Sequence, residues 1–142
     1  MVSKINRVFV DTCAFKALMD DRDGFNDDAS EIIGNLIDRG DELVTSNYVI
    51  DECMTLLRTK CGRKNALKLR EFLLDSEPTI NIVRVKMSDE AGAWKWFEKD
   101  WSKLSFTDCV TFAQMKRLGI NRVFGFDKHF ERAGFKLEKK IN

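Results

Sequence analysis

The sequence predicts an α/β fold in which a mainly parallel sheet lies between two layers of helices. Short runs of β-branched and aromatic residues alternate along the chain with longer runs whose apolar positions recur every three or four residues. No Gly/Ser-rich linker and no repeat interrupts this alternation. Strands that are joined through helices pair in parallel, so we expect a three-layer α/β/α sandwich.

Length and composition indicate one ordinary globular domain. The 142 residues are 44% hydrophobic and 33% charged, enough for a buried core, so a single domain over residues 1–142 is expected. No apolar run is long enough to cross a bilayer, and no signal-peptide pattern precedes the first strand, so a cytoplasmic protein without a membrane partner is expected. The spacing of the four cysteines predicts neither a zinc site nor a C-x-x-C pair, which favours reduced, mostly buried thiols.

The first two strands each precede a helix. Residues 5–10 are rich in Val and Phe, which is typical of a buried central strand. A short helix is expected over residues 12–19. The apolar stripe of residues 29–39 predicts a second helix, with Asn26 or Asp27 as its cap. Residues 42–45 then form a short second strand.

The middle of the chain predicts a helical hairpin. Ser46 is expected to cap a helix that runs to about residue 60, Gly62 breaks it, and a fourth helix covers residues 64–74. The hairpin is basic, because residues 58–70 contain six cations and no acid. Its positive face is expected to bind phosphates, with a solvated helix surface as the alternative, although the whole chain has a net charge of only +1.

The remaining elements complete the alternation. Residues 79–85 alternate as a third strand, and Ser88 is expected to cap a helix over residues 89–100. The remaining predicted elements are a helix over residues 105–118, a strand over 120–126, a helical turn over 128–133 and an edge strand over 135–137. Helical spacing places Trp94, Phe97 and Trp101 on one face and Trp96 off it, so the four rings cannot all point inward. Some of them are expected to line a dimer or partner surface, with RNA-base stacking and core packing as alternatives.

Four acidic residues are predicted to meet at one edge of the sheet. Asp11 ends the first strand, and Glu52 lies in the helix after the second. Asp108 lies in the first turn of a later helix, and Asp127 ends the fourth strand. Two charges about 4 Å apart repel by about 1 kcal/mol in water and about 4 kcal/mol at an effective dielectric constant of about 20, so a compensating cation is expected. Oxygen ligands without sulfur or imidazole favour Mg²⁺ or Mn²⁺.

Three of these acids also have a local interpretation. Asp11 is suited to cap the first helix, Ser105 and Asp108 have the spacing of a capping box, and Asp127 is suited to cap the turn that follows it. Capping does not account for Glu52, which lies inside a helix. The meeting of all four acids at one edge therefore favours a metal site.

Several short segments together carry a family resemblance, namely residues 8–12, 49–52, 55–57, 104–109, 126–130 and 133–135. In these segments the chain resembles the PIN-domain nucleases, and among them the VapC-type toxin ribonucleases of toxin–antitoxin pairs. The resemblance implies that Asp11, Glu52, Asp108 and Asp127 are the metal-binding and catalytic acids, with Thr107 and Thr12 as supporting polar residues.

The implied activity is that of a Mg²⁺-dependent endoribonuclease that leaves 5′-phosphate and 3′-hydroxyl ends. The resemblance also implies a homodimer and a cognate antitoxin that covers the active site. Arg58 and Lys60 follow Glu52 by about two helical turns and are expected to contact phosphates that flank the cleaved bond.

Other functions fit the sequence less well. A phosphohydrolase of small molecules would have a paired D-x-D at the first strand end, where Asp11 is followed by Thr12 and Cys13. A receiver-like signalling or binding module would have an acidic neighbour beside Asp11. A metal-free ribonuclease with a histidine pair is excluded, because His129 is the only histidine and is interpreted as a hydrogen-bonding residue at a helix start. A PIN domain in housekeeping RNA processing stays an alternative to a toxin.

Overall fold

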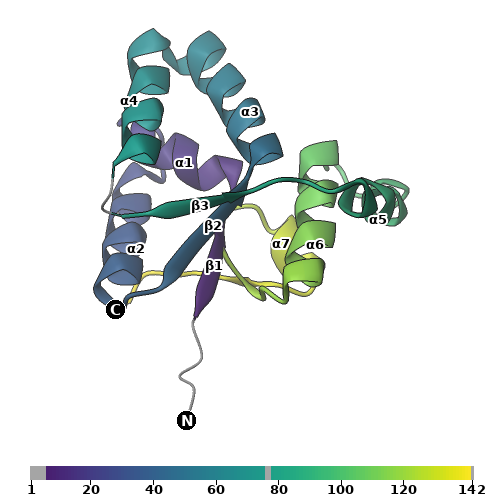
Figure 1. Ribbon diagram of the computed structural model, residues 1–142. Coiled ribbons are helices and arrows are strands. Elements are labelled where there is room, and N and C mark those ends of the chain that lie inside the picture. Colours follow the sequence, from purple (N-terminus) through teal and green to yellow (C-terminus); the bar gives the residue numbers. More distant parts are fainter. Residues whose placement is uncertain (1–5, 76–77, 142) are drawn as a thin grey trace.

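A five-stranded sheet forms the centre of the molecule, and every neighbouring pair of its strands is parallel. The computed structural model describes residues 6–75 and 78–141. Across the sheet the strands follow the order β3-β2-β1-β4-β5 (Figure 1). The strands are β1 Arg7–Val10, β2 Glu42–Ser46, β3 Ile80–Val83, β4 Arg122–Phe124 and β5 Lys136–Leu137.

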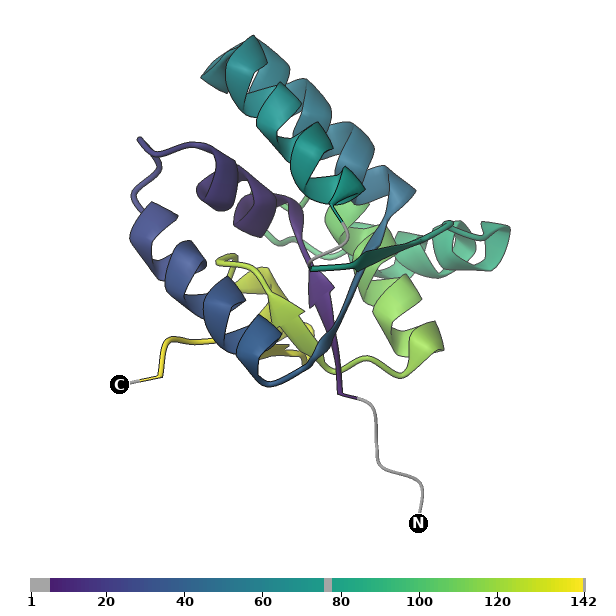
Figure 2. The ribbon, with the colours of Figure 1, turned by 60° about the vertical axis from the view of Figure 1, so that its left-hand side comes forward.

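Helices lie on both sides of this sheet, which confirms the predicted three-layer α/β/α sandwich (Figure 1). α1 and α2 lie on one side, α6 and α7 lie on the other, and α5 packs outside α6. α3 and α4 form a hairpin beyond the carboxyl ends of the strands, as both views show (Figure 2). The helices are α1 Thr12–Met19, α2 Asn26–Asp38, α3 Asn47–Leu56, a π-helical turn Leu57–Cys61, α4 Arg63–Leu74, α5 Met87–Phe97, α6 Phe106–Leu118 and α7 His129–Arg132.

The core is built around the central strand β1. Val8, Phe9 and Val10 have no exposed surface, as the apolar run of this strand predicts for a strand covered on both faces. Phe9 pairs in register with Val44 of β2 and Val123 of β4, and both are buried. No helix in the described part of the chain has the length and apolar character needed to cross a membrane.

Two predicted helix starts have different outcomes. Ser46 caps α3 as expected, since its Oγ accepts a hydrogen bond from the Val49 N–H at 3.1 Å. The prediction for α2 is wrong, because the helix already begins at Asn26 and Phe25 takes the cap position. The amide of Asn26 donates instead to the Ala17 carbonyl at 2.8 Å, which ties α2 to α1.

The α5 prediction is wrong at both ends. The carboxylate of Asp89 accepts the Lys86 N–H at 2.8 Å, so Lys86 rather than Ser88 takes the cap position. The helix ends at Phe97 instead of continuing to residue 100. The chain then turns, and Trp101 packs against Trp96 with ring centroids 5.9 Å apart rather than sharing the face of Trp94.

The last helix and every strand except β2 are shorter than predicted, whereas β2 extends one residue further, to Ser46. Ile5, the predicted start of the first strand, lies outside the described residues. β4 ends at Phe124, so Asp127 lies three residues beyond the strand instead of ending it. Gly125 and Phe126 extend the chain between them. The strand edge therefore continues as a short loop that carries the fourth acid.

An ion pair between a buried carboxylate and a partly exposed arginine joins α5 to α6. The side chain of Asp89 is 1% exposed, and its two oxygens accept hydrogen bonds from Arg117 at 2.7 and 2.9 Å. Burial alone would raise the pKa of Asp89, but the bonds from Arg117 and from the Lys86 amide hold it below its usual value. The ion pair therefore keeps the buried Asp89 carboxylate charged at the contact between α5 and α6.

Replacing Arg117 by Met is expected to lower the free energy of unfolding by about 3 kcal/mol, because it leaves a buried carboxylate without its cation. Urea unfolding followed by circular dichroism measures the change. Lys116→Met is the matched control, since Lys116 is exposed on the same turn and forms no ion pair in the described residues. Equal losses for both variants would contradict a stabilising role of the pair.

Candidate functional site

The carboxyl end of β1 buries the first predicted acid. The Asp11 N–H donates to the Phe124 carbonyl at 3.0 Å, and Asp11 is 1% exposed. Gly125 lies against it, because a Cβ on Gly125 would be 3.3 Å from the Asp11 Cβ. We did not predict this glycine from the sequence, although a glycine within a strand pattern often marks such a close approach.

The second acid, Glu52, lies on α3 beyond the end of β2. The neighbouring Cys53 is buried, and its thiol donates to the Thr12 carbonyl at 3.8 Å. This contact holds the turn that carries Glu52 against the start of α1, immediately after Asp11. The side chain of Glu52 is half-buried.

The remaining two acids are fixed by local hydrogen bonds. Asp108 forms the predicted capping box with Ser105: its Oδ2 accepts the Ser105 N–H at 3.3 Å, and the Ser105 Oγ accepts the Asp108 N–H at 3.0 Å. Asp127 Oδ1 accepts the His129 N–H at 2.9 Å. Asp11 occupies the cap position of α1, as its local interpretation predicts, but its side chain accepts no capping hydrogen bond.

Burial and the charges of neighbouring carboxylates raise the pKa values of Asp11 and Asp108. Burial and then the charge of Asp108 raise the pKa of Asp11 well above its usual value, and Glu52 adds to the rise. Burial raises the pKa of Asp108 to about 6, with further contributions from Asp127 and Glu52 against the hydrogen bonds of Ser105. The acids therefore form one cluster of negative charge.

The thiol of Cys13 lies near all four carboxylates and is affected by the charge of each. The residue is exposed, but desolvation of its sulfur raises the pKa of the thiol, and each of the four carboxylates adds to the rise. All four thiols are free, as the prediction of reduced cysteines requires. Cys53 and Cys109 are buried and Cys61 is half-buried, whereas Cys13 is exposed.

The chemistry of the cluster fits a hard divalent cation. Asp11 Oδ1 is buried without a hydrogen-bond partner among the described residues, as is the hydroxyl of Thr12. Within residues 6–75 and 78–141 no Lys or Arg forms an ion pair with any of the four acids. The same residues contain no three His, Cys, Asp or Glu side chains already arranged as a metal site. The fit therefore rests on the donor atoms and their uncompensated charge.

The predicted supporting and RNA-binding residues fall in two places. Thr12 is 5% exposed and follows Asp11, and Thr107 is half-buried beside Asp108. Arg58 and Lys60 are exposed on the π-helical turn at the tip of the hairpin. The structure brings the two threonines to the acids and leaves the two cations on the hairpin surface.

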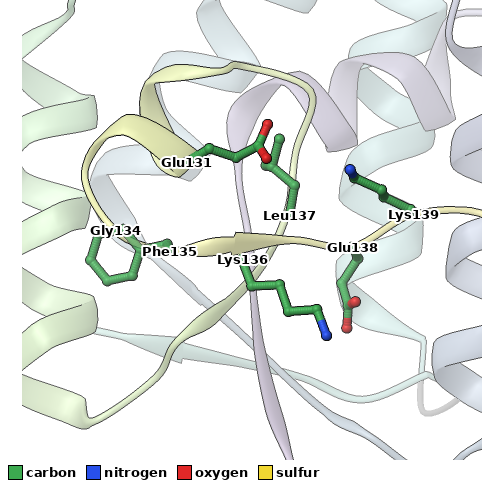
Figure 3. A pocket seen from close by; sticks show the side chains of 7 residues that line it. All are labelled: Glu131, Gly134, Phe135, Lys136, Leu137, Glu138 and Lys139. Carbon is green, nitrogen blue, oxygen red and sulfur yellow. The ribbon is translucent and has the colours of Figure 1, made fainter.

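A separate cavity of about 530 Å³ lies over β5 and contains none of the four acids (Figure 3). Lys136 and Glu138 point to one side of the strand and Leu137 to the other. Glu138 also accepts a hydrogen bond from Arg122 of β4. This cavity is a feature of the sheet edge and is distinct from the acid cluster.

Comparison with known proteins identifies a family with this fold. Residues 8–136 match the PIN domain family. The chain is 31% identical over 129 residues to the 23S rRNA-specific endonuclease VapC20 of Mycobacterium tuberculosis, a match that covers 90% of this chain and 95% of that protein.

Solved structures share the fold. The crystal structure of VapC20, described as a Sarcin-Ricin loop cleaving toxin, superposes with a TM-score of 0.77 and covers the same 90% and 95% of the two chains. VapBC2 from Rickettsia felis, bound to a promoter DNA fragment, has a TM-score of 0.68 at 14% identity and covers 93% of this chain and 97% of that chain. FitAcB from Neisseria gonorrhoeae has a TM-score of 0.65 at 14% identity, with 93% and 96% covered. The parallel sheet, the acids at its edge and the match over residues 8–136 show that the chain belongs to the PIN domain family.

Proposed function

We propose that this protein is a metal-dependent endoribonuclease whose acids Asp11, Glu52, Asp108 and Asp127 hold Mg²⁺, with Mn²⁺ as a substitute. The observation that carries the proposal is the cluster of four carboxylates with no cationic partner in the described residues and a buried, unpaired oxygen on Asp11. The similarity to VapC20, a 23S rRNA-specific endonuclease, supports RNA as the substrate.

The protein's own residues orient the site. A bound divalent ion supplies positive charge that polarises the scissile phosphate and water. The capping box at Ser105 fixes the orientation of Asp108, and the His129 N–H fixes that of Asp127. Burial keeps Asp11 in a dry position where its interaction with a cation is strong. Thr12 and Thr107, which adjoin Asp11 and Asp108 in the chain, supply hydroxyl groups near these carboxylates.

We further propose that the protein acts in the cytoplasm as the toxin of a toxin–antitoxin pair and cleaves a structured ribosomal RNA. The support is the 31% identity to VapC20, whose structure is described as that of a Sarcin-Ricin loop cleaving toxin. A cognate antitoxin is then the expected protein partner. The sarcin-ricin loop of 23S rRNA is the first substrate to test.

The test uses end-labelled 23S rRNA and the purified protein free of antitoxin. We expect cleavage in Mg²⁺, none in EDTA, and fragments that carry 5′-phosphate and 3′-hydroxyl ends. Cleavage that persists in EDTA would contradict metal dependence. A folded protein that binds Mg²⁺ and leaves total RNA intact would point instead to a non-enzymatic binding module.

An exposed aromatic cluster on α5 and α6 supports a homodimer. Trp94 is 54% exposed and Phe97 is 46% exposed, and both pack against Phe106 with ring centroids 4.8 and 5.6 Å away. Apolar rings at the surface are typical of subunit interfaces.

Replacing Trp94 and Phe97 by Ser is expected to shift the protein from dimer to monomer in sedimentation velocity, because the interface loses its two largest apolar side chains. Leu74→Ser is the control, since Leu74 is 74% exposed on α4, away from this cluster. A wild-type protein that sediments as a monomer at every concentration would contradict the dimer.

A further inference from the structure

A row of alternating cations and aromatic rings begins beside Asp127 and crosses α7, the loop after α5, and the end of α5. These elements and α6 lie on the same side of the sheet (Figure 1). We call this set the cation-aromatic row. Its members are Lys95, Lys99, Lys116 and Arg132 with the rings of Trp96, Trp101 and His129.

The row starts at the acid cluster. The His129 N–H donates to Asp127 Oδ1 at 2.9 Å. The imidazole of His129 stacks on Trp101, with ring centroids 5.7 Å apart and planes 13° from parallel, and its Nε2 lies 2.8 Å from the Ser102 carbonyl. The first ring of the row is therefore held by the same backbone turn that orients one of the acids.

The rings position the cations. The Arg132 guanidinium carbon lies 4.5 Å from the centroid of Trp101. Lys99 Nζ lies 5.9 Å from Trp101 and 5.7 Å from Trp96, and Lys95 Nζ lies 5.8 Å from Trp96. Cations over ring faces at these distances are attracted by the rings, so their positions are partly ordered before any ligand binds.

The row keeps its charge. Among the described residues none of its four cations forms an ion pair with a carboxylate. Arg117 and Arg122, by contrast, are paired with Asp89 and Asp41. Lys116 borders a cavity of about 290 Å³ together with Lys95, Lys99 and Trp96, which extends the row onto α6.

We propose that the cation-aromatic row binds backbone phosphates of the RNA strand that leads away from the scissile bond. The proposal rests on the proposed nuclease function. It commits to a polyanion because four cations without a carboxylate partner in the described residues, three of them held over rings, follow the turn that carries Asp127. Phosphate contacts fix the register of a nucleic acid without reading its sequence, so the row would position RNA rather than select it.

The test measures RNA binding without cleavage. The protein carries Asp108→Asn, the buffer contains EDTA, and a fluorescent sarcin-ricin loop RNA with single-stranded extensions is titrated by anisotropy over a series of salt concentrations. Lys99→Ala and Arg132→Ala are each expected to weaken binding by about three- to fivefold and to lower the salt slope by about one. The double variant should lower the slope by about two.

Two further variants complete the design. Lys139→Ala removes an exposed cation outside the row and is expected to leave affinity within about twofold of the parent. Trp101→Leu removes the ring that holds Lys99 and Arg132, whereas Trp101→Phe keeps a ring there, so only the first should weaken binding. Thermal unfolding checks the fold of both. If Trp101→Leu unfolds, the lysine and arginine variants still decide the outcome.

Parental affinity and salt slope in the Lys99 and Arg132 double variant would overturn the proposal, and an acidic protein segment would then be the better occupant of the row. Cleavage by the wild-type acids in Mg²⁺ is measured separately. If RNA binds through the row but is not cut, the proposed nuclease function is contradicted and the proposed RNA binding by the row stands. If the row variants and the wild type cut RNA equally well, the proposed role of the row is contradicted and the proposed nuclease function stands.

Discussion

Replacing Asp108 or Asp11 by Asn is expected to lower RNA cleavage by at least about 10³-fold without unfolding the protein. Each substitution removes an anionic ligand from the proposed metal site, and metal-ion catalysis supplies several kcal/mol of transition-state stabilisation. Each 1.36 kcal/mol corresponds to about tenfold in rate, so losing most of this stabilisation gives a loss of that size. Single-turnover cleavage of the sarcin-ricin loop RNA in Mg²⁺ measures it.

Stability should change in the opposite direction. In EDTA at about pH 7, Asp11→Asn is expected to raise the free energy of unfolding, because burial and then the charge of Asp108 disfavour the ionised carboxylate in the folded protein. A residue that serves only the fold would lose stability when replaced. Opposite effects on activity and stability would identify Asp11 as a residue kept for function.

Asp51→Asn is the matched control for both measurements. Asp51 precedes Glu52 on α3 but is exposed, so its replacement is expected to change stability by no more than about 0.5 kcal/mol and to leave cleavage unchanged. Cleavage that survives Asp108→Asn would remove Asp108 from the site. An equal loss of cleavage in Asp51→Asn would show that net charge, rather than the four acids, controls the rate.

The protein without divalent cations is expected to become less stable as pH rises from about 4 to about 7. The Asp108 carboxyl has a pKa of 3.8 when unfolded and about 6 in the folded protein, so between these values the folded state binds more protons than the unfolded state. The free energy of unfolding therefore falls with rising pH. The Asp108 contribution is fully present below about pH 4, is lost above about pH 6 and amounts to about 3 kcal/mol. Asp11 acts in the same direction.

Urea unfolding in EDTA at pH 5 and pH 7.5 measures this difference. Asp108→Asn is expected to reduce it strongly, and Asp51→Asn should keep it. Added Mg²⁺ should raise stability at pH 7.5 in the wild type, because a ligand that binds only the folded state stabilises it. Equal wild-type stability at the two pH values in EDTA would contradict the raised pKa values of the acid cluster.

The arrangement of the site could be predicted to a large extent from the sequence, because it depends on topology. Alternating strand and helix periodicities imply parallel pairing, and parallel pairing brings the carboxyl ends of the strands to one edge. Asp11, Glu52 and Asp108 are all at the predicted positions on this edge. The caps at Ser46 and Ser105 could also be predicted, since each involves residues only three positions apart.

Two predictions that rested on local pattern were wrong where a side chain makes a contact outside that pattern. The side-chain nitrogen of Asn26 donates to the Ala17 carbonyl, and α2 begins at Asn26 instead of after it. Asp89 pairs with Arg117, 28 residues away, and in the same position accepts the Lys86 N–H that moves the start of α5. The Ala17 and Arg117 contacts join residues that are nine and 28 positions apart, so no pattern of neighbouring residues contains them.

The sequence by itself determined the order of elements, the parallel sheet and the edge at which the acids meet, since these follow from the periodicity and connection of the segments. Only the tertiary structure decided the depth at which Asp11 is buried, the close approach of Gly125 and the stacking of Trp101 on His129. Burial and mutual repulsion set the charge of the acid cluster, and contacts among three separate segments build the cation-aromatic row. The charge of the acid cluster and the cation-aromatic row both depend on contacts between residues that are distant in the chain. They therefore form only when the chain has folded.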